Sequence, residues 1–215
     1  MADYKAYVFD FDLTLADSRS GIITCFRHTL EVFGYPQPTD EAIVATIGIP
    51  LTDGFDVLTG IKMNPQREDM RKVYAKKGDE VMAANTFFYD DTVEVLEGLR
   101  RGGAKVGIVS SKMRYRIIET FDRQVKCRPY DIIIGLDDVD RPKPDPAGIE
   151  LIIEKLGIKK SELLYVGDSY IDAETAMNAG VDFAGVTTGS TGKEELEKYP
   201  HVYVGGSLTE VFGNI

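Results

Sequence analysis

The sequence contains few of the residues that build histidine or cysteine sites. With only His28 and His201, the chain cannot form a histidine-rich metal site, and a Ser-His-Asp triad is disfavoured. Cys25 and Cys127 lie far apart and form no CxxC pair, so they lack the spacing of a zinc site. We expect both to be reduced, buried thiols of a cytoplasmic protein. The chemistry of this chain must therefore come from other side chains.

The chain also lacks an excess of positive charge and long apolar segments. Its 25 basic residues are outnumbered by 35 acidic ones, and the formal net charge is -10. A nucleic acid or an anionic membrane surface would repel such a chain on average. No apolar run approaches the ~18 residues of a membrane span, and Asp3 and Lys5 interrupt the start, where a signal peptide is apolar. We therefore expect a cytoplasmic monomer or homodimer whose partner is a small molecule.

The predicted secondary structure changes character along the chain. Residues 5–9 are typical of a short buried strand, whereas the pattern from about Ser18 to Asn85 predicts helices alone. After Tyr89, helices and strands alternate as far as a possible edge strand at 201–206. This alternation predicts an α/β fold, a parallel sheet with helices on both faces.

The helical block predicts an α-helical cap inserted after the first strand. We place the α/β core at residues 1–16 and 88–215 and the cap at 17–87. Within the cap, Asp40 is expected to cap the second helix. With 43% hydrophobic residues, no Pro- or Ser-rich linker and no repeat, the chain is typical of one globular domain with an insertion.

Polar side chains follow several of the predicted strands at their carboxyl ends. Ligands of parallel sheets bind beyond these ends, so residues that are distant in sequence can meet there. The side chains are Asp10, Asp12, Ser110, Lys143, Asp168 and Asp172. Crowded carboxylates need a positive partner, and a hard cation such as Mg²⁺ prefers oxygen ligands. A cation, a lysine, a hydroxyl and backbone amides together indicate a site for a phosphoryl group.

The spacing of Asp10 and Asp12 suits two roles in phosphoryl transfer. Asp10 can attack phosphorus as a nucleophile and form an acyl phosphate. Asp12 can protonate the departing alcohol and later deprotonate a water molecule.

Four segments resemble the motifs of the haloacid dehalogenase superfamily, in the order of that family. They are FDFDLTL (9–15), VSSK (109–112), RPKPDP (141–146) and GDSYIDAETA (167–176). The resemblance covers about two thirds of the chain, and it implies a Rossmann-like core with a C1-type helical cap. One residue departs from the pattern: Leu13 stands where many relatives have glycine, and leucine predicts an ordinary φ.

The resemblance implies a role for each matching residue. Asp10 is the nucleophile, and Asp12 is the general acid and base. The Mg²⁺ ligands that it implies are Asp10, Asp12 (through its backbone carbonyl), Asp168 and Asp172. The substrate- and phosphate-binding residues are Thr14, whose hydroxyl supports the first loop, Ser110, Ser111 and Lys143.

Several residues near the motifs allow two interpretations of their role. Ser111 supplies either a backbone N–H to the phosphate or a helix cap, and Arg19 either lies on a helix surface or contacts substrate. Residues 48–50 either form a cap loop over the site or only pack within the cap. We expect Lys112 and Arg114 to face solvent.

Asp12 indicates the type of reaction. The dehalogenases of the superfamily lack an acid at this position, so Asp12 favours phosphoryl transfer. Transfer to water makes a phosphatase, and transfer to a sugar hydroxyl makes a mutase similar to β-phosphoglucomutase. The cap and its loop GIPLTDG (48–54) look like those of phosphoglycolate phosphatases.

We therefore predict a Mg²⁺-dependent phosphatase that hydrolyses a small phosphate monoester, with phosphoglycolate as the leading substrate. Sugar phosphates, nucleotides and pyrophosphate remain open. A phosphosugar mutase is the main alternative, and a phosphate- or metal-binding protein without catalytic activity is another.

Overall fold

The computed structural model describes residues 4–214, which are built around one parallel sheet. Its six strands have the order β5-β4-β1-β6-β7-β8, and every neighbouring pair is parallel. The strands are β1 (Ala6–Phe9), β4 (Lys105–Val109), β5 (Ile132–Ile134), β6 (Leu163–Gly167), β7 (Asp182–Val186) and β8 (Tyr203–Gly205). The predicted α/β fold is confirmed, including the edge strand near the end of the chain.

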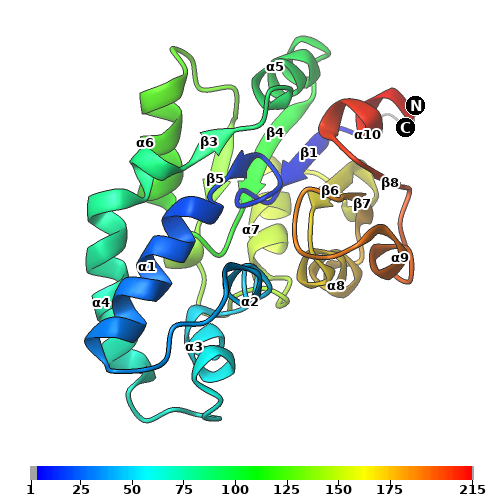
Figure 1. Ribbon diagram of the computed structural model, residues 1–215. Helices are drawn as coiled ribbons and strands as arrows, with labels where there is room; N and C mark the ends of the chain where they lie inside the picture. The colour runs from blue at the N-terminus through cyan, green and yellow to red at the C-terminus, as the bar shows by residue number, and fades with distance from the viewer. Residues whose placement is uncertain (1–3, 215) are drawn as a thin grey trace.

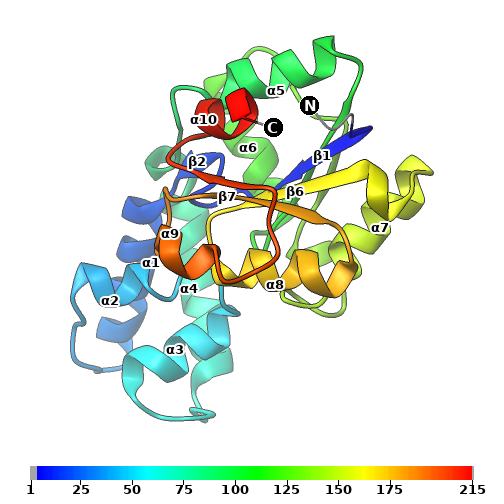
Figure 2. The same ribbon diagram turned by 90° about the vertical axis from the view of Figure 1, so that its right-hand side faces the viewer.

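Helices cover both faces of the sheet (Figures 1 and 2). One face packs against α5 (Thr92–Arg101), α6 (Arg114–Gln124) and α10 (Leu208–Asn214). The other packs against α7 (Ala147–Leu156), α8 (Tyr170–Ala179) and α9 (Lys193–Leu196). Because both faces are covered, the central strands β1 and β6 are buried along their whole length. The short 3₁₀ helices are η1 (Ala83–Asn85), η2 (Leu136–Asp138) and η3 (Lys160–Glu162).

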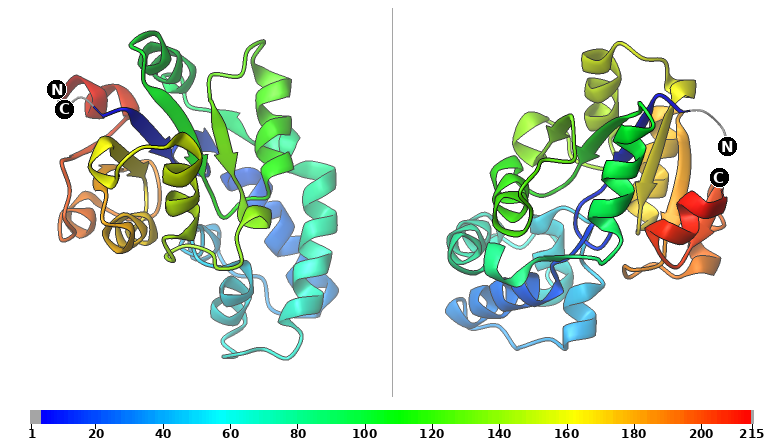
Figure 3. Two further views of the ribbon diagram at one scale, coloured as in Figure 1. Left: turned by 180° about the vertical axis from the view of Figure 1, so that it is seen from behind. Right: turned by 90° about the horizontal axis from the view of Figure 1, so that it is seen from above.

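The helical cap has an apolar core of its own. It consists of α1 (Arg19–Val32), α2 (Asp40–Val44), α3 (Leu51–Thr59) and α4 (Arg67–Val81), followed by η1. The rings of Phe26, Phe55 and Tyr74 pack edge to face at its centre, with centroids 5.0 to 6.1 Å apart. Figures 1 and 3 show the cap beyond one end of the sheet.

Two details of the sequence-based prediction are wrong. Thr39, and not Asp40, caps α2: its hydroxyl accepts a hydrogen bond from the N–H of Ala42. Asp40 is already helical and pairs with Arg27. Of the two thiols, Cys25 is buried as expected, but Cys127 is exposed.

A two-stranded antiparallel ladder connects the cap to the core. It pairs β2 (Ala16–Asp17) with β3 (Phe87–Phe88), and the predicted cap boundaries at 17 and 87 fall within it. The segment that leads from the cap back to the core is held by the side chain of Gln124 on α6. This side chain accepts from the N–H of Phe88 and donates to the carbonyl of Thr86. The sequence analysis did not predict this ladder, since two residues are too few for a period of two to be recognised.

A second contact between cap and core joins α4 to α6. The buried guanidinium of Arg116 donates to the carbonyl of Ala75 at 2.6 Å and pairs with Asp79 at 2.8 Å. The hydroxyl of Tyr115 also donates to Asp79. Gly78 makes room for this arrangement, since a Cβ there would lie 2.5 Å from Nη1 of Arg116. Helix α6 therefore contacts both the cap helix α4 and the segment at β3 that joins the cap to the core.

Within residues 4–214, none of the helices has both the length and the apolar character that a membrane span needs.

Candidate active site

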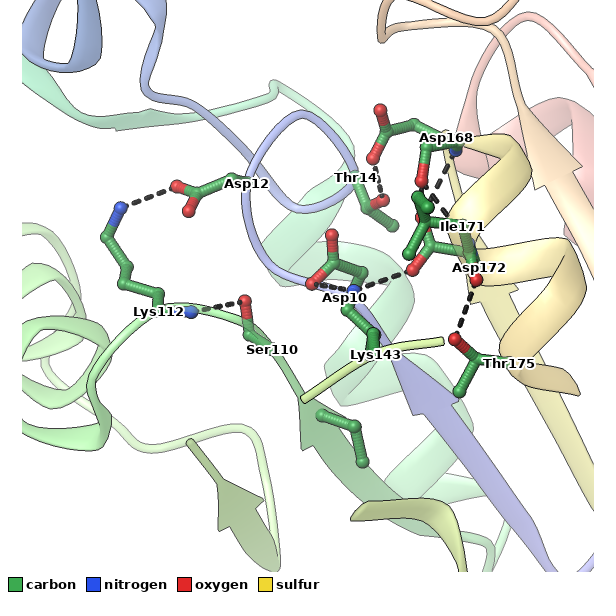
Figure 4. A network of polar contacts seen from close by, with 12 residues as sticks. Asp10, Asp12, Thr14, Ser110, Lys112, Lys143, Asp168, Ile171, Asp172 and Thr175 are labelled. Atoms are coloured by element: carbon green, nitrogen blue, oxygen red, sulfur yellow. Dashed lines mark hydrogen bonds and ion pairs between the residues drawn. The ribbon is translucent and has the colours of Figure 1, made fainter. Parts of the chain in front are cut away.

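The carboxyl edge of the sheet brings the predicted site residues together from distant parts of the chain (Figure 4). Asp10 follows β1, Ser110 follows β4 and Asp168 follows β6. These three strands are neighbours, with β1 in the middle. Lys143 comes from the loop before α7, and Asp172 lies in the first turn of α8.

Asp10, Asp168 and Asp172 form what we call the acidic cluster. Each of them is buried and offers an oxygen within 4.8 Å of the oxygens of the other two. The ammonium of Lys143 lies 2.9 Å from Oδ1 of Asp10 and 2.6 Å from Oδ1 of Asp172. Among the described residues, Lys143 is the one ion-pair partner of Asp10. Three carboxylates against one ammonium leave excess negative charge in the protein interior.

The buried charges shift the pKa values of the cluster. Burial raises the pKa of Asp10 to about 6, although the attraction of Lys143 opposes this shift. Burial also raises the pKa of Asp168 well above its usual range, and repulsion from the other two carboxylates adds to the shift. For Lys143, burial alone would lower the pKa, but the attraction of Asp10 and Asp172 outweighs it and the pKa is raised.

These observations fit a divalent cation. The carboxylates resist being ionised together, and a cation between them would remove that penalty. Oxygen ligands alone favour a hard ion such as Mg²⁺, Ca²⁺ or Mn²⁺ over zinc. The acidic cluster could therefore hold a metal ion.

Neighbouring side chains fix the orientation of the cluster. The hydroxyl of Thr14 donates to Oδ1 of Asp168 at 2.8 Å. Asp172 accepts from Tyr165 at 3.0 Å and from the hydroxyl of Ser169 at 2.5 Å. Ser169 also caps α8, because its hydroxyl accepts from the N–H of Asp172. Tyr165 and Ser169 were not predicted, although both lie close to Asp168 in the sequence.

The backbone approaches the carboxylates closely at two glycines. A Cβ at Gly189, in the loop after β7, would lie 1.7 Å from Oδ2 of Asp168. A Cβ at Gly167 would lie 2.3 Å from Cβ of Asp172. A side chain at either position would displace a carboxylate, so both positions require glycine.

Leu13 has an unusual backbone conformation in the loop after β1. Its φ is 62°, so the expectation of an ordinary φ is wrong. The loop closes on itself, since the N–H groups of Leu15 and Ala16 both donate to the carbonyl of Phe11, and this turn requires a left-handed residue. A non-glycine residue there costs roughly 1 kcal/mol. The fully buried side chain of Leu13, and a 2.5 Å hydrogen bond from Thr188 to its carbonyl, offset that cost.

The carboxylate of Asp12 lies apart from the acidic cluster. Its Oδ1 accepts from Nζ of Lys112 at 2.6 Å and from the hydroxyl of Ser18 at 2.5 Å. The expectation that Lys112 faces solvent is therefore wrong, since its side chain is 5% exposed. Arg114 is 41% exposed and pairs with Asp138. A signal for Lys112 was available: it follows Ser110 closely, in a loop at the carboxyl edge of the sheet.

The hydroxyl groups of Ser110 and Ser111 differ in their hydrogen bonds. The hydroxyl of Ser110 accepts from the N–H of Lys112 at 3.3 Å. Ser111 is not a helix cap, because α6 begins at Arg114, and its buried hydroxyl has no hydrogen-bond partner within residues 4–214.

Arg19 and the cap loop differ in what they contact. Arg19 pairs with Asp17 at 2.5 Å. The loop at residues 48–50 reaches the core, since a Cβ at Gly48 would lie 3.4 Å from Oγ of Ser169.

Comparison with known sequences identifies the family that the four motifs resemble. The model of the haloacid dehalogenase-like hydrolase family matches residues 7–186. The pyrophosphatase PpaX of Bacillus velezensis is 32% identical over 203 residues, which cover 93% of this chain and 90% of that protein. PpaX of Listeria monocytogenes is 32% identical over 193 residues, with 89% and 87% covered.

Solved structures include similar folds. A haloacid dehalogenase-like hydrolase from Bacteroides fragilis has 45% identity and a TM-score of 0.93, with 97% of this chain and 99% of that chain covered. A predicted phosphoglycolate phosphatase from Haemophilus somnus has a TM-score of 0.87 with 99% and 98% covered; at 19% identity this likeness shows the fold alone.

Proposed function

The chain belongs to the haloacid dehalogenase-like hydrolase family, and from this membership we propose that it is a Mg²⁺-dependent phosphatase of small phosphate compounds. One observation supports the proposal most directly. Asp10 contacts the ammonium of Lys143, and its carboxylate clusters with those of Asp168 and Asp172. Asp12 follows Asp10 in the same loop. A nucleophile, a fixed positive charge, a cation site and a separate acid are the parts that phosphoryl transfer needs.

The proposed reaction has two steps. In the first, a carboxylate oxygen of Asp10 attacks phosphorus, the bond from phosphorus to the leaving oxygen breaks, and that oxygen takes a proton from Asp12. In the second, water attacks the phosphorus of phosphorylated Asp10 and gives a proton to Asp12. The bond between phosphorus and Asp10 then breaks, orthophosphate leaves, and both side chains return to their starting states.

Other residues bind and orient the phosphoryl group. The hydroxyl of Ser110 and the ammonium of Lys143 would hold its oxygens, and Ser111 would contribute its backbone N–H. Mg²⁺, held by the acidic cluster and the backbone carbonyl of Asp12, would supply charge that offsets the phosphoryl oxygens.

Two substrates lead the proposal. Phosphoglycolate is supported by the sequence of the cap loop, and pyrophosphate by the names of relatives with 32% identity. Both are small, and the cap loop at Gly48 lies against Ser169 at the edge of the site, which favours a small substrate.

Phosphate release from phosphoglycolate, pyrophosphate and p-nitrophenyl phosphate tests the function, with Mg²⁺ and with EDTA. We expect turnover only with the metal. Asp10→Asn should abolish it, and Asp12→Ala should slow it roughly 10²- to 10⁴-fold. Asp122→Asn, which changes a surface carboxylate that pairs with Arg128, is the control and should keep full activity.

Three results would contradict the proposal. They are equal turnover in EDTA, an active Asp10→Asn protein, and no turnover of any phosphate compound, the last of which would indicate a binding protein. β-Glucose 1-phosphate with its 1,6-bisphosphate tests the mutase alternative, since a mutase would form glucose 6-phosphate faster than it releases phosphate.

A further inference from the structure

The ion pair between Asp12 and Lys112 has to break during the proposed reaction. Nζ of Lys112 lies 2.6 Å from Oδ1 of Asp12, and the two side chains are only 5% and 16% exposed. Figure 4 shows the carboxylate of Asp12 directed at Lys112 and away from Asp10. To protonate an oxygen on the phosphorus that Asp10 attacks, the carboxyl group of Asp12 must turn toward Asp10. Lys112 then loses its partner.

Among the described residues, Lys112 has no second carboxylate to pair with. Within residues 4–214, Asp12 is the one carboxylate that forms an ion pair with it. Its backbone is held in place, because its N–H donates to Ser110 and its carbonyl accepts from the N–H of Leu136. Its ammonium lies 5.7 Å from the centre of the Phe11 ring, inside the protein. A buried ammonium that loses its only anion is strongly destabilised, so a replacement anion is needed at this position.

We propose that Lys112 exchanges the carboxylate of Asp12 for an anionic group on the leaving-group side of the substrate. The released carboxylate takes up a proton from solvent and becomes the acid that protonates the leaving oxygen. It returns a proton to solvent when it pairs with Lys112 again after turnover. This inference rests on the proposed phosphatase function and narrows its substrate class. The substrates are phosphate esters or anhydrides whose leaving group has its own negative charge close to the leaving oxygen, either a carboxylate or a second phosphate. With a neutral leaving group, Lys112 has no anion to bind. Asp12 then stays paired with Lys112 and cannot protonate the leaving oxygen.

The place of the pair in the fold suits such an exchange. Lys112 lies in the loop after β4, and the other donor to Asp12 is Ser18, which directly precedes the first cap helix. The carboxylate of Asp12 is thus held between the core and the start of the cap. An anion that binds Lys112 would compete with the acid for the same ammonium.

Phosphoglycolate and phosphoglycolamide provide the test, because they differ only in the charge of the leaving group. In the wild-type protein with Mg²⁺, we expect kcat/KM to be higher for phosphoglycolate on the order of 10- to 100-fold, the usual worth of a hydrogen bond to a charged group. Lys112→Met should bring this ratio close to one. It should also lower the ratio of pyrophosphate to p-nitrophenyl phosphate turnover by a similar factor.

Arg114→Met is the matched control. It removes a cation two residues further along the chain, at the start of α6. Arg114 pairs with Asp138 and not with Asp12, so both ratios should stay at the wild-type value. Lys112→Gln repeats the experiment with a polar side chain, in case the methionine variant does not fold.

Two results would overturn the inference while the phosphatase function stands. One is a wild-type protein that hydrolyses phosphoglycolate and its amide equally well. The other is a Lys112 variant that slows all substrates by the same factor, which would show a structural role only. A wild-type protein that hydrolyses none of these compounds would overturn the proposed function itself.

Discussion

Replacing the nucleophile should stabilise the metal-free protein at neutral pH. Asp10 is buried, and its pKa is raised from 3.8 to about 6. A raised carboxyl pKa means that the folded state binds the proton more tightly than the unfolded chain does, so stability is lost as the pH rises from about 4 to about 6. Asn has a similar shape and never ionises, so Asp10→Asn avoids this loss.

The size of the effect follows from the shift. A difference of about 2 pKa units corresponds to about 3 kcal/mol at 1.36 kcal/mol per unit. In EDTA at pH 7.5, Asp10→Asn should therefore be more stable than wild type by up to about 3 kcal/mol, or roughly 6–12 °C in Tm. Near pH 4 most of this difference should disappear, because the carboxyl group is then protonated in the folded state and partly protonated in the unfolded chain.

Urea unfolding at pH 4 and pH 7.5 measures the difference. Asp131→Asn is a control of opposite sign: burial would raise the pKa of Asp131, but hydrogen bonds from Val106 and Lys105 outweigh it and lower the pKa. That stability exists above the unfolded pKa and is lost at lower pH, so Asp131→Asn should be less stable than wild type at pH 7.5. Mg²⁺ should stabilise wild type more than Asp10→Asn, which lacks a ligand.

One result would refute the reasoning. If metal-free Asp10→Asn is no more stable than wild type at pH 7.5, the ionised carboxylate is not under electrostatic strain, and the acidic cluster has no excess charge for a cation to neutralise.

Two further substitutions test other parts of the structure. Gly78→Ala should lack the 0.5–1 kcal/mol gain that alanine usually gives in a helix, because its Cβ would displace Arg116; Gly98→Ala, whose Cβ would only approach Arg101 at 3.8 Å, should show that gain in thermal unfolding. Equal changes in the two variants would argue against the contact between α4 and α6. Leu13→Gly relieves roughly 1 kcal/mol of strain but removes a fully buried leucine worth about 2–5 kcal/mol, so urea unfolding should show a net loss of stability. A stabilised Leu13→Gly protein would mean that strain in the first loop exceeds the packing of this side chain.

The sequence allowed the core of the fold to be predicted because its signals are local. Buried parallel strands are short apolar runs, and a polar residue that marks the edge of the sheet directly follows each of β1, β4 and β6. The topology of parallel sheets then predicted that Asp10, Ser110 and Asp168 would lie near one another, and they do.

The features that could not be predicted from the sequence depend on contacts between segments that are distant in the chain. Lys112 follows a strand at the carboxyl edge of the sheet, but only the position of Asp12 across the fold makes this lysine a buried partner. The φ of Leu13 follows from hydrogen bonds that close its loop, whereas leucine by itself favours an ordinary φ. The burial of Arg116 also depends on a distant segment, because Gly78 on another helix makes room for its guanidinium.

The central place of β1 has a consequence for synthesis on the ribosome. Its two neighbours begin at Lys105 and Leu163, whereas the buried core of the cap is complete by Met82. The emerging chain can thus fold its cap while β1, which directly precedes Asp10, is still unpaired, because contacts between nearby segments form sooner than distant ones. A nascent chain that stalls before Leu163 has a cap and no Asp168, so translation beyond β6 is the earliest point at which the protein can acquire its chemistry.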